Sequence, residues 1–143
     1  MEIALQEARQ AAARHEVPVG AVVVSPTGEV LAQAGNRCEE LHDASAHAEI
    51  LALRMAATRM ASARLPGCDL YVTLEPCPMC AQAISLFRIP RVIFGAYDPK
   101  GGGVEHGARV YDAPSCHHRP EVVGGVRESA SAALLRAFFA ARR

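Results

Sequence analysis

The sequence lacks the segments that direct proteins into or across a membrane. Its start, Met1-Glu2-Ile3-Ala4-Leu5, has no basic stretch followed by a long apolar run, and no later segment is long enough to span a bilayer. Internal repeats, blocks of like charge and low-complexity linkers are absent as well. These absences predict a cytoplasmic protein in which residues 1–143 form one domain, long enough to bury a core without crosslinks.

An excess of charge of either sign is also missing. Fifteen Lys and Arg residues balance fifteen Asp and Glu residues, which argues against a protein that grips nucleic acid through its overall charge. Nine basic residues nevertheless follow Cys80, ending with Arg142 and Arg143. Two interpretations of them remain open, a local basic face or arginines scattered over the surface.

A disulfide framework is not expected either, because the number of cysteines, five, is odd. Cys77 and Cys80 belong to a closely spaced motif. Cys38, Cys68 and Cys116 have no evident partners, and none of them lies in a nucleophile motif. We interpret these three as free, packed thiols.

The most informative residues are His47-Ala48-Glu49 and Pro76-Cys77-Pro78-Met79-Cys80. His47, Cys77 and Cys80 are three candidate zinc ligands, and three protein ligands leave one position of tetrahedral zinc open for water. A structural zinc site is normally closed by a fourth Cys or His, whereas an open site beside a carboxylate suits hydrolysis. Glu49 is too close to His47 to share the metal comfortably and is the natural proton shuttle.

Hydrophobic periodicity and turn signals predict strands that alternate with helices. Helices are expected at residues 2–14, 46–61, 79–87 and 128–142, and strands at 17–24, 30–34, 69–74, 91–95 and 121–126. The ligands would then lie near the starts of two helices, where the helix dipole favours thiolates. Strands separated by helices imply crossovers and a sheet covered by helices on both faces.

The spacing H-x-E followed by P-C-x-x-C is a signature of zinc-dependent nucleobase deaminases. Further segments carry a narrower resemblance: Val17–Val22, Gly35–Arg37, Ala46–Ile50, Leu70–Cys77 and Phe94–Ala96. With them, the chain resembles the bacterial tRNA-specific adenosine deaminases over nearly its whole length. The resemblance implies the cytidine-deaminase-like fold, a three-layer α/β/α sandwich with a five-stranded mixed sheet. It also implies one zinc ion per chain and a homodimer.

The activity implied by this resemblance is hydrolytic deamination of adenosine to inosine at the wobble position of a tRNA anticodon loop. Glu49 would move the protons, and the backbone N–H of Ala48 would lie near the substrate. Asn36 would pair with the base, although an Asn after Gly is also a common turn residue. Asp98 would lie near the ribose; the alternative is that its segment is an ordinary flexible loop. His118 would lie near the substrate cleft.

Two other patterns have competing interpretations. Cys116, His117 and His118 resemble a metal-ligand cluster, but they lie far along the chain from the zinc motif, and we interpret Cys116 as a packing residue. Phe138 and Phe139 either pack in the core or stack on an unpaired base. Core packing is favoured for this pair because the helix is amphipathic.

Two rival functions remain open from the sequence. A deaminase of free guanine, cytosine or a nucleoside would share every zinc residue, and the neutral charge and the lack of a basic tail after Arg143 favour it. An anticodon stem-loop of tRNA is favoured as the substrate by Asn36, Asp98 and the extent of the resemblance. A non-catalytic, zinc-stabilised nucleic-acid-binding module would have no use for Glu49 or for the open metal position.

Overall fold

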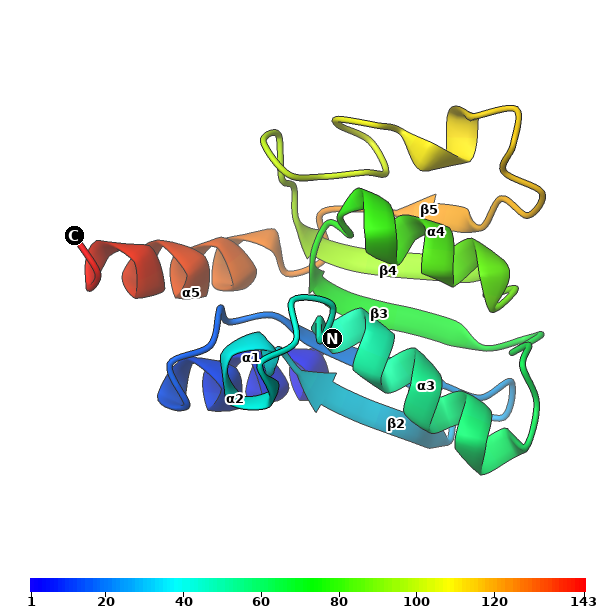
Figure 1. Ribbon diagram of the computed structural model, residues 1–143, viewed down its shortest axis with the longest axis horizontal. Coiled ribbons are helices and arrows are strands. Elements are labelled where there is room, and N and C mark those ends of the chain that lie inside the picture. Colours follow the sequence, from blue (N-terminus) through cyan, green and yellow to red (C-terminus); the bar gives the residue numbers. More distant parts are fainter.

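The computed structural model describes residues 1–143, and Figure 1 shows its helices and strands. The helices are α1 (Glu2–Ala13), α2 (Cys38–Leu41), α3 (Ala48–Met60), α4 (Pro78–Leu86), the 3-10 helix η1 (Val110–Asp112) and α5 (Glu128–Ala140). The strands are β1 (Gly20–Val24), β2 (Val30–Gly35), β3 (Asp69–Leu74), β4 (Arg91–Ala96) and β5 (Glu121–Val123). No helix combines the length and the apolar character needed to cross a bilayer.

The five strands form one sheet in the order β2-β1-β3-β4-β5. Strand β1 is antiparallel to both β2 and β3, whereas β3, β4 and β5 are parallel. The β1–β2 hairpin is shifted in register between Val23 and Val24, next to the turn that begins at Ser25. The predicted five-stranded mixed sheet is therefore confirmed.

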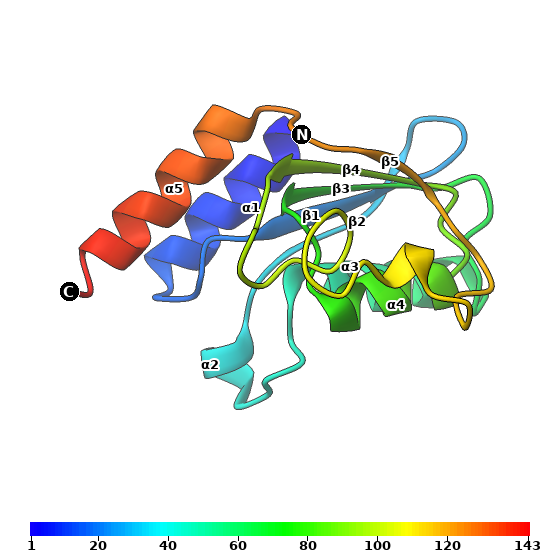
Figure 2. The same cartoon turned by 90° about the horizontal axis from the view of Figure 1, so that it is seen from above.

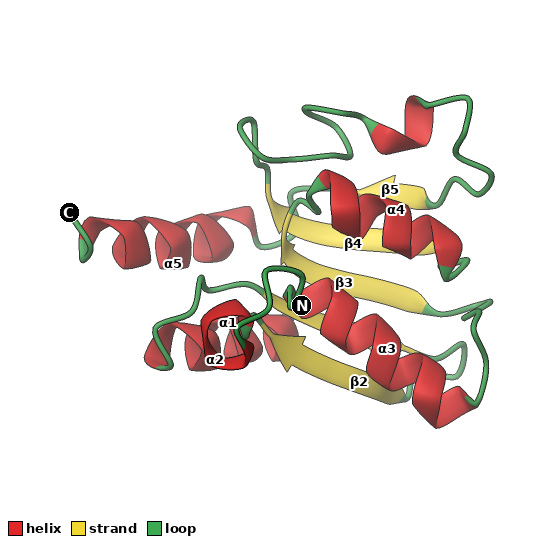
Figure 3. Cartoon of the chain, in the orientation of Figure 1, coloured by secondary structure: helices red, strands yellow, loops and turns green.

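Helices cover both faces of this sheet, as the edge view in Figure 2 shows. α3 and α4 lie on one face, and α1 and α5 lie side by side on the other. One cluster of 22 buried residues joins the strands to α3 and α4. Figure 3 shows the resulting layers, with the yellow strands between red helices. The predicted α/β/α sandwich is confirmed.

Close packing of α1 on the sheet requires glycine at one position. A Cβ atom on Gly20 would lie 1.9 Å from the carbonyl oxygen of Ala4 and 2.7 Å from the backbone nitrogen of Ala8. No side chain fits in this space, so α1 lies directly against β1.

The observed elements differ from the predicted ones, and the 3-10 helix η1 was not expected from the sequence. β1 begins at Gly20, because the N–H of Val19 bonds to the carbonyl of Val17 in a tight bend (2.8 Å). β5 ends at Val123, since Gly124 and Gly125 follow and Gly125 has a φ of 82°. The short helix α2 was not predicted.

The extra helix α2 owes its position to a distant carboxylate. Buried Glu16 accepts hydrogen bonds from the backbone N–H groups of Glu39 (3.1 Å) and Glu40 (2.9 Å), at the start of α2. A side chain from another element thus satisfies N–H groups that a helix start leaves free. The segment between β2 and α3, which leads into the zinc motif, is anchored in this way.

Candidate metal centre and substrate pocket

His47 and Cys77 occupy equivalent positions at the starts of two neighbouring helices. His47 is the N-cap residue of α3 and Cys77 that of α4, and both have extended backbones (ψ of 150° and 171°). Pro78 follows at the first position of α4, where a missing N–H is tolerated. Cys80 lies in the first turn. The two helix starts meet beyond the carboxyl end of β3, and this arrangement brings the three side chains together.

The three candidate ligand atoms lie at distances that suit a tetrahedral zinc ion. The Nδ1 atom of His47 is 3.6 Å from the Sγ atom of Cys77 and 3.5 Å from that of Cys80, and all three ligand atoms lie within 4.8 Å of one another. Zinc–sulfur bonds of about 2.3 Å and zinc–nitrogen bonds of about 2.0–2.1 Å would separate sulfur and nitrogen by about 3.5 Å at a tetrahedral angle. The donor set and its spacing therefore fit zinc.

Electrostatics at the cluster favour a thiolate at Cys77. A hydrogen bond from the Cys80 thiol lowers the pKa of Cys77 to about 4, with burial opposing this shift and His47 adding to it. The same contact and burial raise the pKa of Cys80. Without a metal the two sulfurs thus share one proton, and a cation that binds both must release it.

Glu49 lies in the pocket but is not part of the three-residue ligand cluster. Its side chain is buried, and burial raises its pKa to about 6. A carboxyl group poised near neutral pH can both accept and donate a proton. The proton-shuttle role that the sequence predicts for Glu49 stays a prediction, and the burial and raised pKa of this carboxyl group are compatible with it.

A pocket of about 310 Å³ surrounds these groups. Its lining includes His47, Glu49 and Cys77 together with two of the predicted substrate residues, Asn36 and Asp98. Residues more than 60 positions apart in the sequence, from β2 to the loop after β4, thus meet at one end of the sheet. Parallel α/β sheets place ligand sites beyond the carboxyl ends of their strands.

Asn36 and Ala48, both predicted to contact substrate, contact each other. The Oδ1 atom of Asn36 accepts a hydrogen bond of 2.8 Å from the backbone N–H of Ala48. The side-chain carbonyl of Asn36 is therefore occupied, and its NH₂ group is the part left to meet a ligand. The sequence interpretation, in which Asn36 pairs with the base, did not include this bond.

Asp98 is the second residue of the loop between β4 and η1, residues 97–109, which we call the β4–η1 loop. Its Oδ1 atom accepts hydrogen bonds from the N–H groups of Lys100 (3.2 Å) and Gly101 (2.9 Å). One oxygen of this carboxylate thus holds a local turn. The residue also lines the pocket, so the structural and the substrate-facing interpretations are compatible.

His118 is not among the residues that line this pocket. Its Nε2 atom lies 2.7 Å from the carbonyl oxygen of Ile89, and its own carbonyl accepts a hydrogen bond from the hydroxyl of Ser85 (2.7 Å). These bonds hold it between the end of α4 and the start of β4. The expected position near the cleft is therefore wrong for this chain, since the segment before β5 follows the other end of the sheet.

The remaining cysteines and histidines form no second metal cluster. Cys38, Cys68 and Cys116 are free, as predicted. His47, Cys77 and Cys80 are the one group of His, Cys, Asp or Glu side chains with metal-binding spacing. Cys116 is buried beside Ser85 and the carbonyl of His118, which agrees with its interpretation as a packing residue.

A second, larger pocket of about 880 Å³ was not anticipated from the sequence. It shares Val17, Leu74, Asp98 and Gly101 with the metal pocket, so the two hollows adjoin each other. Its outer walls carry aromatic and basic side chains from the β4–η1 loop and the end of α5: Tyr97, Lys100, Phe139, Arg142 and Arg143. The sequence signals for it were the basic residues at the end of the chain, the possible stacking role of Phe139 and the expected substrate contact of Asp98.

The two phenylalanines of α5 have different surroundings. Phe138 is buried, whereas the side chain of Phe139 is 48% exposed and faces the larger pocket. Arg142 lies over the ring of Phe138, with its guanidinium carbon 3.3 Å from the ring centroid. Core packing is therefore confirmed for Phe138 but not for Phe139.

Comparison with known proteins agrees with this geometry. Residues 1–96 match the family model of the cytidine and deoxycytidylate deaminase zinc-binding region. A tRNA-specific adenosine deaminase of Agrobacterium fabrum is 57% identical over 143 residues, which cover 100% of this chain and 93% of the relative.

Solved structures show the same relationship. One, from a study of A-to-I editing by tRNA:A34 deaminases at the wobble position of transfer RNA, is 58% identical with a TM-score of 0.92. That match covers 94% of this chain and 97% of the other. A guanine deaminase from Nitrosomonas europaea shares the fold alone, with a TM-score of 0.83 at 24% identity over 97% of this chain and 82% of its own. The chain therefore belongs to the tRNA-specific adenosine deaminase family, within the zinc-binding cytidine and deoxycytidylate deaminases.

Proposed function

We propose that this protein is a zinc-dependent hydrolase that converts adenosine to inosine at the wobble position of a tRNA anticodon loop. The observation that carries the proposal is the position of the two pockets side by side. A metal pocket of about 310 Å³ shares four lining residues with a groove of about 880 Å³ that has aromatic and basic walls. A free base would occupy only the inner part, whereas the nucleotides flanking a splayed base need such an outer surface.

His47, Cys77 and Cys80 would hold one zinc ion per chain. The bound ion supplies Lewis acidity, which makes a water molecule nucleophilic near neutral pH. The donor spacing of 3.5 and 3.6 Å supports this assignment. Residues 1–143 would act as one catalytic domain, because one core carries both ligand segments.

Glu49 would move each proton of the reaction. Its carboxylate takes a proton from the attacking water and delivers it to the ring nitrogen N1 as oxygen adds to C6. A second proton, passed from the new hydroxyl group through Glu49, leaves with the amino group as ammonia. Water and adenosine thus yield inosine and ammonia. Burial holds the pKa of Glu49 at about 6, which suits a group that must give up and regain protons.

Asn36 and Asp98 would orient the nucleotide. The NH₂ group of Asn36 is free of the Ala48 bond and can donate to an acceptor on the purine edge. Asp98 lies where the metal pocket meets the larger groove, a position suited to the ribose of the target or flanking nucleotide. Ala48 would act mainly by fixing Asn36. A tRNA substrate also agrees with the cytoplasmic location expected from the sequence.

A homodimer is part of this proposal. Several large apolar side chains on the outer face of α3 and α4 are uncovered in one chain: Met55 is 51%, Met79 39% and Leu86 61% exposed. The two helices lie next to each other on this face (Figure 1). A second copy is the partner that the family resemblance implies, and the molar mass in solution from light scattering tests it.

The main rival is a deaminase of a free base or nucleoside, which the shared fold of the guanine deaminase and the zero net charge favour. The deciding experiment incubates the zinc-loaded protein with an anticodon stem-loop of tRNA-Arg and, separately, with adenosine, guanine and cytosine. We expect inosine in the stem-loop and little turnover of the small molecules. Efficient turnover of a free base with an unchanged stem-loop at low salt would replace the proposal by its rival. Binding of RNA without any turnover would indicate a non-catalytic module.

A further inference from the structure

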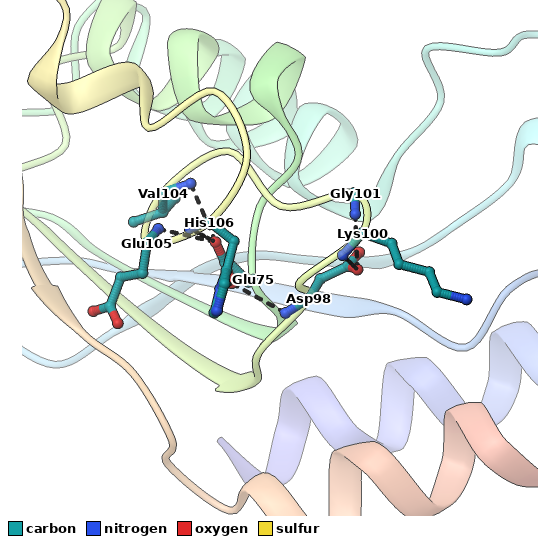
Figure 4. Close-up of polar contacts among 7 residues, drawn as sticks. All are labelled: Glu75, Asp98, Lys100, Gly101, Val104, Glu105 and His106. Atoms are coloured by element: carbon teal, nitrogen blue, oxygen red, sulfur yellow. Dashed lines mark hydrogen bonds and ion pairs between the residues drawn. The ribbon is translucent and has the colours of Figure 1, made fainter.

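Glu75 is a buried carboxylate at the end of β3, two residues before Cys77, and it accepts five hydrogen bonds. Its Oε1 atom accepts from the backbone N–H of Asp98 (3.0 Å) and from Nδ1 of His106 (2.8 Å). Its Oε2 atom accepts from the N–H groups of Val104 (3.3 Å), Glu105 (2.9 Å) and His106 (3.0 Å). Figure 4 shows these donors around the carboxylate. The carboxylate of Glu75 thus bonds to both ends of the segment of residues 98–106.

The side chains of Glu75 and His106 differ in their exposure to solvent. The side chain of Glu75 is 0% exposed, while that of His106 is 37% exposed. His106 is therefore the part of this network that can be changed without opening the core.

Two glycines let the β4–η1 loop lie against the metal-ligand segment. A Cβ atom on Gly102 would lie 2.5 Å from Oε2 of Glu75, and one on Gly103 would lie 2.6 Å from the backbone nitrogen of Pro78. The N–H of Gly103 also bonds to the carbonyl of Pro76 (2.8 Å). The loop is thus seated directly on the start of α4, which carries Cys77 and Cys80.

The opposite side of the same loop forms the walls of both pockets. Asp98 and Gly101 line the metal pocket and the larger groove, and Lys100 lines the groove. Tyr97, also in the groove wall, makes an edge contact with the His106 ring, with centroids 5.9 Å apart. No bond of Glu75 reaches the ligand side chains themselves.

We propose that Glu75 is a positioning residue that acts through His106. It fastens residues 98–106 to the metal-ligand segment, so that the substrate meets a loop already in its binding position. The predicted change in KM rests on the proposed function, whereas the fastening of residues 98–106 does not. A preformed loop strengthens binding because the loop loses less conformational entropy when the substrate binds. Loosening the loop should therefore raise KM more than it lowers kcat.

The test compares His106→Ala with His106→Asn, whose side-chain NH₂ can stand in for the Nδ1–H donor. The matched control is His117→Ala, since His117 is exposed and makes no hydrogen bond through its side chain. On the stem-loop we expect KM of His106→Ala to rise about 5- to 20-fold, the effect of one lost hydrogen bond to the Glu75 side chain, with kcat within about 2-fold. His106→Asn should recover most of the loss, and the control should match the wild type.

Zinc content and thermal midpoint are measured on the same proteins. A positioning role predicts that both stay at wild-type levels in His106→Ala while KM rises. If KM does not change, or if kcat, zinc and thermal midpoint fall together without recovery in His106→Asn, the inference is wrong. Gly102→Ala gives a second check, because its Cβ atom would crowd Oε2 of Glu75 and disturb the contact between the loop and that carboxylate, so it should also raise KM.

Hydrogen exchange separates this inference from the proposed function. The amides of Val104, Glu105 and His106 donate to Glu75, so they should exchange slowly in the zinc-loaded wild type and faster in His106→Ala. If the wild-type protein were inactive on RNA, the proposed function would be wrong. The hydrogen-exchange rates alone would then test the positioning role of Glu75. Unchanged exchange in His106→Ala would overturn the positioning role.

Discussion

The side-chain carbonyl of Asn36 accepts a hydrogen bond of 2.8 Å from the backbone N–H of Ala48. This bond joins the residue after β2 to the first residue of α3, directly after His47. It gives the amide of Asn36 a defined orientation, with its NH₂ group as the free donor. One residue thereby supports the metal-ligand segment and, in the proposed function, would also donate to the substrate.

The two tasks of Asn36 can be separated by substitution. Asn36→Asp keeps an acceptor for Ala48 but loses the NH₂ donor, so thermal stability should stay close to wild type while kcat/KM falls. Loss of a buried polar contact is typically worth ~1–3 kcal/mol, or about 5- to 150-fold. Asn36→Ala should show the same kinetic loss and a lower thermal midpoint as well. Equal activity of Asn36→Asp and wild type would remove the NH₂ group from substrate binding.

Removal of one thiol should remove the metal. Cys77→Ser and Cys80→Ser each leave two ligands, and we expect zinc per chain, measured by atomic emission after dialysis, to fall well below one equivalent. Cys68→Ser is the matched control, because Cys68 is free and remote from the ligand cluster. A full equivalent of zinc in both ligand variants would contradict the assignment of Cys77 and Cys80 as zinc ligands.

Glu49 should make the metal-free protein less stable at neutral pH. Burial raises its pKa from 4.5 to about 6, so the folded state keeps a proton that the unfolded state loses between these values. Stability therefore falls as pH rises from 4.5 to 6, by ~2 kcal/mol in total. In the presence of chelator, Glu49→Gln should be more stable than wild type at pH 7.5, with the difference shrinking toward pH 4.5. Denaturant unfolding measures this, and a constant difference across the range would contradict it.

The basic end of the chain should act on RNA binding and not on chemistry. Arg142 and Arg143 line the larger groove, so Arg142→Glu and Arg143→Glu should weaken stem-loop binding and flatten its dependence on salt, by about 0.7 in the log–log slope for each lost phosphate contact. The rate at saturating RNA should change little. Arg64→Glu, which alters an exposed arginine outside both pockets, controls for net charge. Equal salt slopes in all variants would argue against RNA contacts at this end.

The metal ligands could be predicted because their spacing is local. His47 and Glu49 are two residues apart and Cys77 and Cys80 three apart, at the starts of α3 and α4, where sequence patterns are clear. The sheet was predictable for the same reason, from short β-branched runs between helices.

What the sequence did not reveal depends on contacts between distant residues. Glu16 creates a start for α2 from 23 residues away, and Glu75 gathers donors up to 31 residues away. The bond between Asn36 and Ala48 and the groove beside Phe139 arise only when separate elements meet. His118 shows the opposite error, because its family position suggested a cleft that its segment does not reach.

The central claim is that Glu49 moves the protons for deamination of adenosine in RNA beside a zinc ion held by His47, Cys77 and Cys80. The most direct test measures inosine in digests of the anticodon stem-loop under single-turnover conditions, with zinc-loaded wild type and zinc-loaded Glu49→Gln. We expect the wild type to convert the wobble adenosine, and the variant to retain zinc but react at least about 10²–10⁴-fold more slowly. An unreactive wild type, or a Glu49→Gln protein that forms inosine at the wild-type rate, would contradict the account.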